Sequence, residues 1–144
     1  MNVETILKGK GANVVTIEPE ATIGEAAQIL KRERIGSLVV SGDGSNVLGI
    51  ISERDIVAGL GDVTRRARLL EAPVSALMTR DIVTCAPADP VQKCMMLMTE
   101  HHVRHLPVMN DGSMIGLVSI GDVVKNRLEE LESEAGFLRD MIAG

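Results

Sequence analysis

The sequence predicts an α+β fold in which one β-α-β-β-α unit occurs twice and a C-terminal helix follows. The prediction rests on an internal repeat, on the same order of strand and helix patterns in both copies, and on an aliphatic composition. Apolar residues make up 45% of the 144 residues, with one Phe and no Trp or Tyr. This length and composition allow one domain or two small domains packed together.

The repeat spans most of the chain. Residues 13–40 align without a gap with residues 81–108, at a constant offset of 68. The segments GIISERD (49–55) and GLVSIGD (116–122) then align at an offset of 67, because the preceding turn is one residue shorter in the second copy. A looser match joins the lead-ins VETIL and VSALM. A doubled folding unit is therefore expected.

Each copy begins with a short strand and a helix. Residues 14–17 and 82–85 are the expected strands. Thr22 and Glu25 predict a capping box at the first helix, whereas Asp89 predicts an N-cap followed by proline at the first helical position. Each copy continues with an apolar hairpin and a second helix. In the first copy the hairpin strands are expected at 37–40 and 47–52, and the helix at Ser52. In the second copy the strands are expected at 105–109 and 114–119, and the helix at Ser119.

The repeat also suggests domain boundaries. We assign 1–61 to the first domain, 62–80 to a linker with a lead-in helix, 81–125 to the second domain and 126–144 to a C-terminal helix. That helix carries a narrow apolar seam of coiled-coil type that is shorter than a free coiled coil requires. The seam should therefore pack on its own domain or on a second subunit, and it consists of Val124, Leu128, Leu131, Ala135, Leu138 and Ile142.

Composition argues against several functions. The net charge of −5 and the lack of aromatic side chains make nucleic-acid binding unlikely as a function. The cysteines, Cys85 and Cys94, are too few for a disulfide framework and are expected to be buried thiols. No signal-peptide pattern and no membrane-length apolar run is found, so a cytoplasmic protein without membrane association is expected.

Three histidines lie close together in HHVRHLPV (101–108). His101 and His105 have the spacing of a helical zinc site. By the repeat alignment, however, His101 and His102 end a helix and His105 opens a strand. No metal site and no catalytic residue is therefore predicted, and a metal-dependent hydrolase that uses His101, His102 and His105 stays as an alternative.

The repeated chemistry lies in SERD (52–55) and SIGD (119–122). A Ser-x-x-Asp sequence at a helix start forms a capping box without any ligand. The same arrangement offers amide groups to a phosphate and a carboxylate to ribose hydroxyls. Both interpretations remain open on the residues alone.

The doubled unit, each copy ending in Gly-hydrophobic-hydrophobic-Ser-x-x-Asp, resembles a tandem pair of CBS domains, named after cystathionine β-synthase. RHLPV (104–108) adds to the resemblance, which covers roughly residues 3–124. It implies two repeats packed as a pseudo-twofold pair with clefts between them, and often disc-shaped dimers. It also implies ligands that contain adenosine: AMP, ADP, ATP, NAD-type dinucleotides or S-adenosylmethionine.

The resemblance further implies that the motif aspartates hold ribose and that the motif serines lie by ribose and phosphate. It places the first-strand threonines near adenine and the residues before Val108 in the base pocket. The two copies differ at aligned positions. Arg54 of the first copy aligns with Gly121, and Arg104 and His105 of the second copy align with Gly36 and Ser37, so unequal sites are expected. The expected ligand-binding residues are Thr16, Ser37, Ser52, Arg54, Asp55, Thr84, Arg104, His105, Leu106, Pro107, Ser119 and Asp122.

These expectations define a non-catalytic regulatory module for energy sensing, with an adenine nucleotide (AMP, ATP or NAD(H)) as ligand and no covalent cofactor. A homodimer and an unidentified regulated protein are the expected partners. A purely structural dimerisation module is the further alternative.

Overall fold

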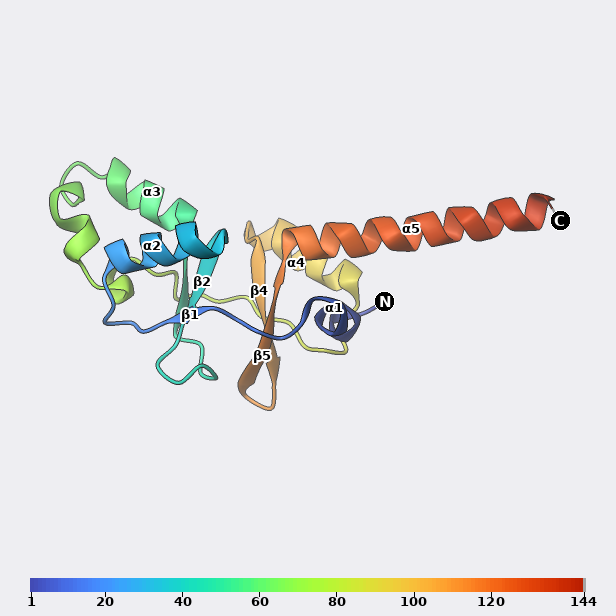
Figure 1. Ribbon diagram of the computed structural model, residues 1–144, viewed down its shortest axis with the longest axis horizontal. Coiled ribbons are helices and arrows are strands. Elements are labelled where there is room, and N and C mark those ends of the chain that lie inside the picture. Colours follow the sequence, from blue (N-terminus) through green and yellow to red (C-terminus); the bar gives the residue numbers. More distant parts are fainter. Residues whose placement is uncertain (144) are drawn as a thin grey trace. The chain divides into compact units, whose positions relative to one another are not determined.

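The computed structural model describes residues 1–143, and its elements follow the predicted order in the first repeat and, except for the first strand, in the second (Figure 1). The chain divides into two compact units. The repeat-1 unit comprises Asn13–Ile82 with Asp111–Met114; the repeat-2 unit comprises Met1–Ala12, Val83–Asn110 and the described residues from Ile115 onward. No described helix is long and apolar enough to cross a membrane.

The repeat-1 unit contains a three-stranded sheet in the order β1-β2-β3. Strand β1 is parallel to β2, and β2 is antiparallel to β3, with Ser37 directly opposite Ser52. The predicted β-α-β-β-α order is confirmed here. The elements are β1 (Thr16–Ile17), α2 (Ile23–Glu33), β2 (Ser37–Val40), β3 (Gly49–Ser52), α3 (Glu53–Gly61) and the 3₁₀ helices η1 (Arg66–Glu71) and η2 (Val74–Ala76).

The repeat-2 unit pairs only β4 with β5, because the strand expected at 82–85 is reduced to one parallel bridge between Cys85 and Val108. Pro107 explains this difference: it lacks the N–H that a longer parallel ladder would need from its position. The equivalent residue in repeat 1 is Val39, which pairs with β1. The elements are α1 (Val3–Lys10), α4 (Val91–His101), β4 (His105–Asn110), β5 (Ser113–Ser119) and α5 (Ile120–Ala143).

The two first helices of the repeats start differently. Thr22 and Glu25 form the predicted capping box at α2. The prediction for Asp89 was wrong, because Pro90 occupies the N-cap position of α4 and the helix begins at Val91. The Asp89 carboxylate instead accepts the Ala86 N–H at 2.8 Å, which closes the preceding turn and leaves no side chain to cap the helix.

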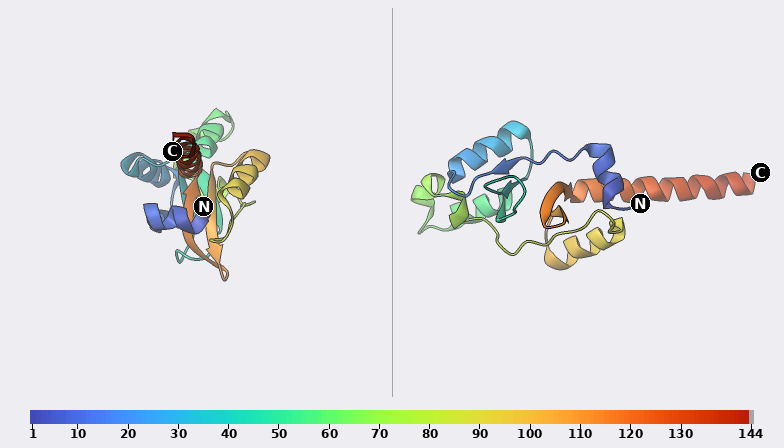
Figure 2. Two further views of the ribbon diagram at one scale, coloured as in Figure 1. Left: turned by 90° about the vertical axis from the view of Figure 1, so that its right-hand side faces the viewer. Right: turned by 90° about the horizontal axis from the view of Figure 1, so that it is seen from below.

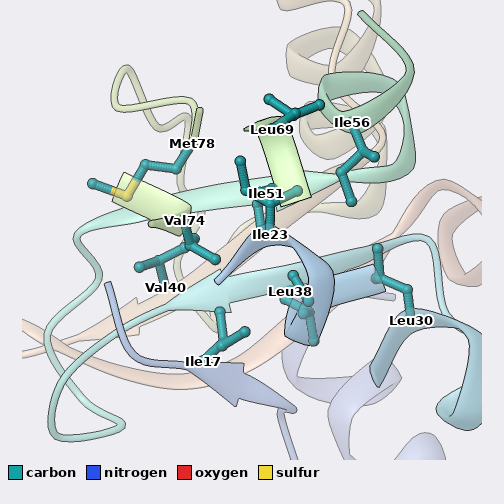
Figure 3. Close-up of a cluster of buried hydrophobic side chains, with 11 residues drawn as sticks. Ile17, Ile23, Leu30, Leu38, Val40, Ile51, Ile56, Leu69, Val74 and Met78 are labelled. Atoms are coloured by element: carbon teal, nitrogen blue, oxygen red, sulfur yellow. The ribbon is translucent and has the colours of Figure 1, made fainter. Parts of the chain in front are cut away.

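Equivalent positions build both hydrophobic cores. The repeat-1 core gathers side chains from the sheet, α2, α3 and the 3₁₀ segments (Figure 3). Both cores consist of buried aliphatic and sulfur-containing side chains, and a residue of the repeat-1 core has its aligned counterpart in the repeat-2 core. The pairs are Ile17 with Cys85, Ile23 with Val91, Ala26 with Cys94, Leu30 with Met98, Leu38 with Leu106, Val40 with Val108, Ile51 with Val118 and Ile56 with Val123.

Each core is completed by the lead-in of the other repeat. Val74 and Met78 join the repeat-1 core, whereas Val3 and Ile6 join the repeat-2 core. The compact units thus group residues 1–12 with the second repeat. The sequence alone places these residues in the first domain, 1–61. A glycine in each hairpin gives the lead-in room: a Cβ at Gly49 would lie 2.8 Å from the Met78 sulfur, and one at Gly116 would lie 2.6 Å from Leu7.

Candidate ligand-binding site

The first candidate site is a group of polar side chains where β3 runs into α3. The Asp55 carboxylate oxygen Oδ2 accepts the Ser52 N–H at 2.9 Å and the Ser52 hydroxyl at 3.1 Å. In return, the Asp55 N–H donates to Ser52 Oγ at 3.2 Å. The second carboxylate oxygen, Oδ1, accepts the Thr79 hydroxyl at 3.3 Å. Ser52 and Asp55 therefore form the capping box that the sequence allowed.

Ser37 lies beside this capping box. It is opposite Ser52 in the β2–β3 register, and only 3% of its surface is exposed. Within residues 1–143, the buried hydroxyl oxygen of Ser37 has no hydrogen-bond partner. Because an unpaired buried hydroxyl costs free energy, it calls for a partner or a function. We refer to Ser37, Ser52, Asp55 and Thr79 as the Asp55 cluster.

The second candidate site is the equivalent junction of β5 and α5. Asp122 Oδ2 accepts the Ser119 N–H at 2.9 Å, and the Asp122 N–H donates to Ser119 Oγ at 3.2 Å. Here, however, Lys10 contacts the same carboxylate: its Nζ lies 2.6 Å from Asp122 Oδ2 and 3.0 Å from the Leu117 carbonyl oxygen. We refer to Lys10, His105, Ser119 and Asp122 as the Asp122 cluster.

The charges of the Asp122 cluster act on one another. Burial alone would raise the pKa of Asp122, but the Lys10 ammonium and the Ser119 hydrogen bonds outweigh burial and hold the pKa below its usual value. The pKa of His105 is also lowered, first by burial and then by the positive charges of Lys10 and Arg104, against the opposing charge of Asp122. The cluster therefore holds an ionised carboxylate beside a neutral imidazole at pH 7.

The helix starts are less available to a phosphate than the sequence suggested. In α3 the Glu53 N–H donates to the Gly36 carbonyl oxygen at 3.0 Å, and the Asp55 N–H is used by Ser52. In α5 the Ile120 N–H donates likewise to the Arg104 carbonyl oxygen at 2.8 Å. In each helix, two of the first-turn amides thus serve the fold itself, which leaves the side chains as the main recognition groups.

The remaining predicted residues are dispersed. Thr16 lies on β1, separated from β3 by β2, and lines an open hollow of about 410 Å³ beside α2. Thr84 is exposed just before the Cys85 bridge. Leu106 and Pro107 are buried, and Leu106 belongs to the repeat-2 core. The structure thus brings Ser37, Ser52 and Asp55 together in one group. It brings His105, Ser119 and Asp122 together in a second group. Arg54 and Arg104 are exposed near the two helix starts.

The histidines do not form the shared helix face of a zinc site. His101 is the last residue of α4, His102 is its C-cap in the left-handed conformation, and His105 opens β4. Within the described part of the chain, no three His, Cys, Asp or Glu side chains gather in a way that could hold a metal ion. In the described residues, the three histidines of the hydrolase alternative therefore do not come together as one metal site.

Sequence reasoning missed Lys10 and Thr79. Both come from lead-in segments outside the aligned repeat, and both contact an aspartate far away in the sequence. The loose similarity of the two lead-ins was the only signal for them. It indicated that the lead-ins are equivalent but not which repeat each one contacts.

Comparison with known proteins agrees with this architecture. The CBS domain family model matches residues 10–62 and 74–129. The CBS domain-containing protein YhcV of Bacillus subtilis is 30% identical over 115 residues, which cover 80% of this chain and 79% of YhcV. The crystal structure of the CBS-domain containing protein ATU1752 from Agrobacterium tumefaciens is 40% identical, with a TM-score of 0.83 over 88% of this chain and 99% of that one.

A third relative carries adenosine-containing ligands. The CBS domain pair of protein MJ0100, in complex with 5′-methylthioadenosine and S-adenosyl-L-methionine, is 25% identical with a TM-score of 0.75, over 87% of this chain and 98% of that chain. A doubled α+β unit with a Ser-x-x-Asp helix start in each copy thus defines a tandem-repeat module. The chain belongs to the CBS domain family and contains the domain twice.

Proposed function

We propose that the protein is a non-catalytic regulatory module that binds adenosine-containing ligands at the Asp55 and Asp122 clusters. The proposed ligands are AMP, ADP, ATP or NAD(H), which would make the protein a sensor of cellular energy state. The proposal includes a homodimer, a cytoplasmic location where these nucleotides are abundant, and an unidentified protein whose activity responds to binding.

One observation carries this proposal: the unpaired, buried Ser37 hydroxyl beside the Ser52–Asp55 capping box. A carboxylate has about four acceptor sites, so Asp55 retains capacity for ribose hydroxyls after capping its helix. Ser37 supplies a hydroxyl that gains a partner when a polar ligand arrives. The MJ0100 complex supports the ligand class, because that relative is a CBS domain pair with bound adenosine derivatives.

The two clusters differ in charge, which supports unequal ligand preferences. The Lys10 ammonium pairs with Asp122, and the positive charges of Lys10 and Arg104 both act on His105. The Asp55 cluster instead contributes neutral hydroxyls to its carboxylate, with Arg54 exposed in the first turn of α3. A phosphate-bearing ligand should therefore prefer the Asp122 cluster, since cations attract phosphate oxygens.

Titration calorimetry with adenosine, AMP, ADP, ATP, NADH and S-adenosylmethionine tests the proposal. We expect binding to two non-identical sites, with Asp55→Asn and Asp122→Asn each weakening a different one. Asparagine is chosen because its amide oxygen can still accept the N–H of the capping serine, so that lost binding is not confused with lost folding. Asp89→Asn is the matched control, since Asp89 caps a turn in the repeat-2 unit outside both clusters.

The outcomes separate the alternatives. Binding that survives the Asp55→Asn/Asp122→Asn double variant would overturn the assignment of the two clusters. No binding of any of the six ligands would instead favour the structural dimerisation module. Stoichiometric zinc in metal analysis of the purified protein would favour the hydrolase that uses His101, His102 and His105.

A further inference from the structure

The seam of helix α5 is exposed over its whole length. Its large residues are between 44% exposed, for Val124 and Leu131, and 87% exposed, for Ile142, and Ala135 is exposed as well. In both Figure 1 and Figure 2, the C-terminal half of α5 extends beyond the other elements of the repeat-2 unit. A row of exposed aliphatic side chains on a projecting helix marks an interaction surface.

A different face of α5 packs on the repeat-2 unit. Val123 is 1% exposed in the repeat-2 core, and Glu130 pairs with the Met1 amino group at 3.3 Å. Residues 123 and 130 lie seven apart on one face, whereas the seam residues 124 and 131 lie about 100° further around the helix. The unit that carries α5 therefore leaves the seam open.

The seam has the composition of a two-stranded coiled coil. In heptad notation, Val124, Leu131 and Leu138 occupy d positions, and Leu128, Ala135 and Ile142 occupy a positions. Leucine at d is favourable in parallel dimers, as is a β-branched residue such as Ile142 at a. Gly136 falls at b, on the outer side, so its helix-weakening effect does not remove a packing residue.

The flanking charges select both the partner and its orientation. Arg127 and Glu134 occupy g positions, and Glu132 and Arg139 occupy e positions. In a parallel, in-register pair, each g residue faces the e residue five positions later in the other helix. Arg127 then meets the second copy's Glu132, and Glu134 meets the second copy's Arg139, so that the symmetry gives four opposite-charge contacts.

The antiparallel arrangement is disfavoured by the same charges. When two antiparallel α5 helices overlap over the full seam, e faces e and g faces g. Glu132 would then face its own counterpart, and so would Glu134. Like charges in such positions repel. A self-pairing surface that is complementary in one orientation only indicates a specific contact.

We propose that α5 pairs with α5 of a second copy as a short, parallel, in-register coiled coil over residues 124–142. This inference rests on the homodimer of the proposed function and specifies which surface forms it. A second copy is the partner that fits this surface, because the charge pattern is complementary to itself.

Charge reversal tests the pairing by sedimentation equilibrium of the full chain. Glu134→Arg would place an arginine against the second copy's Arg139, and Arg139→Glu would place a glutamate against Glu134. An exposed ion pair changes an association constant by roughly twofold, so losing two attractive contacts and gaining two repulsive ones should raise the dimer Kd roughly tenfold. The double variant Glu134→Arg/Arg139→Glu should restore the wild-type Kd.

A matched control and a mixing experiment complete the test. Asp140→Lys makes the same charge change as Glu134→Arg at an f position, away from the seam, and should leave the Kd within twofold of wild type. Mixing the Glu134→Arg and Arg139→Glu single variants should yield mainly the heterodimer, since only that pair restores opposite charges at both contacts.

Orientation is tested by Ile142→Cys with oxidised glutathione. In a parallel pair the two introduced thiols meet and form a disulfide by thiol exchange, whereas in an antiparallel pair they lie at opposite ends of the seam. The wild type, whose thiols are buried, is the control. A dimer that neither responds to charge reversal nor crosslinks would overturn the α5 pairing and leave the homodimer standing. A wild-type monomer at all concentrations would overturn both.

Discussion

The ion pair between Lys10 and Asp122 is the sharpest difference between the two repeats, and Lys10→Met isolates it. Methionine keeps an apolar stem of similar length and removes only the ammonium. The substitution therefore leaves Asp122 ionised, with the Ser119 hydrogen bonds but without its counter-charge. In this variant, burial raises the pKa of Asp122 and Lys10 no longer lowers it.

The size of the effect follows from distance and exposure. The Nζ–Oδ2 distance is 2.6 Å, with side chains 37% and 22% exposed. A hydrogen bond between charged groups contributes about 1.5–3 kcal/mol, and solvent screening at a partly exposed lysine reduces this to about 1 kcal/mol. Lys8→Met is the matched control: its pair with Glu4 is 3.6 Å long, with side chains 77% and 55% exposed. About 0.3 kcal/mol is expected there.

The pH dependence gives the decisive measurement. Because the pKa of Asp122 is lowered in the folded protein, its contribution to stability is present above about pH 4, the usual unfolded value, and is lost as the pH falls through the folded value. NMR titration of the Asp122 carboxyl carbon should give a higher pKa in Lys10→Met than in the wild type, and urea denaturation at pH 7 should give the loss of about 1 kcal/mol. An unchanged Asp122 pKa in Lys10→Met would refute the reasoning.

Three further predictions concern the fold and its titratable groups. Gly49→Ala would place a Cβ 2.8 Å from a methionine sulfur and from a backbone carbonyl oxygen. The free energy of unfolding, measured by urea denaturation, should therefore fall by about 1–3 kcal/mol. Gly42→Ala, whose Cβ would have nothing within 4 Å, is the control and should change it little. Since the pKa of His105 is lowered by burial, the wild type should lose stability relative to His105→Gln as the pH falls below about 6.5, and parallel stability curves would contradict this. Cys85 and Cys94 should resist iodoacetamide until the protein unfolds, because both thiols are buried. The Cys94 thiol and burial also raise the pKa of Cys85. Mass spectrometry measures the labelling, and rapid labelling of the folded protein would contradict this prediction.

The sequence predicted the parts of the fold that local patterns encode. The gapless alignment of the repeats implies equivalent backbone geometry, and Arg34 and His102 indeed end their helices in the same left-handed conformation, with φ of 56° and 54°. The capping box of Thr22 and the helix starts after Ser52 and Ser119 were also readable, because a cap needs only residues within one turn.

The errors arose where a pattern formed by neighbouring residues competed with another contact. Asp89 satisfied the pattern of an N-cap, but its carboxylate closes the turn with the Ala86 N–H, so the helix starts one residue later than predicted. The strand at 82–85 satisfied the pattern of β1 but faces Pro107, which has no N–H for a longer ladder. A proline occupies the N-cap position in the first case and lies on the partner strand in the second.

Thr79 and Lys10, the contacts of the motif aspartates outside the Ser-x-x-Asp motif, escaped prediction for a different reason. Ser and Asp of the motif lie within one turn of each other, but Thr79 and Lys10 reach their aspartates through the exchange of lead-ins: the segment before the second repeat completes the first repeat, and the segment before the first repeat completes the second. The lead-ins lie outside the strictly repeated sequence, and Thr79 and Lys10 belong to neither hydrophobic core, so these two positions can differ without disturbing either core. Two sites built on the same Ser-x-x-Asp geometry thereby acquire a neutral hydroxyl in one copy and an ammonium in the other. The difference in ligand preference that we propose between the copies follows from this exchange rather than from the repeated motif itself.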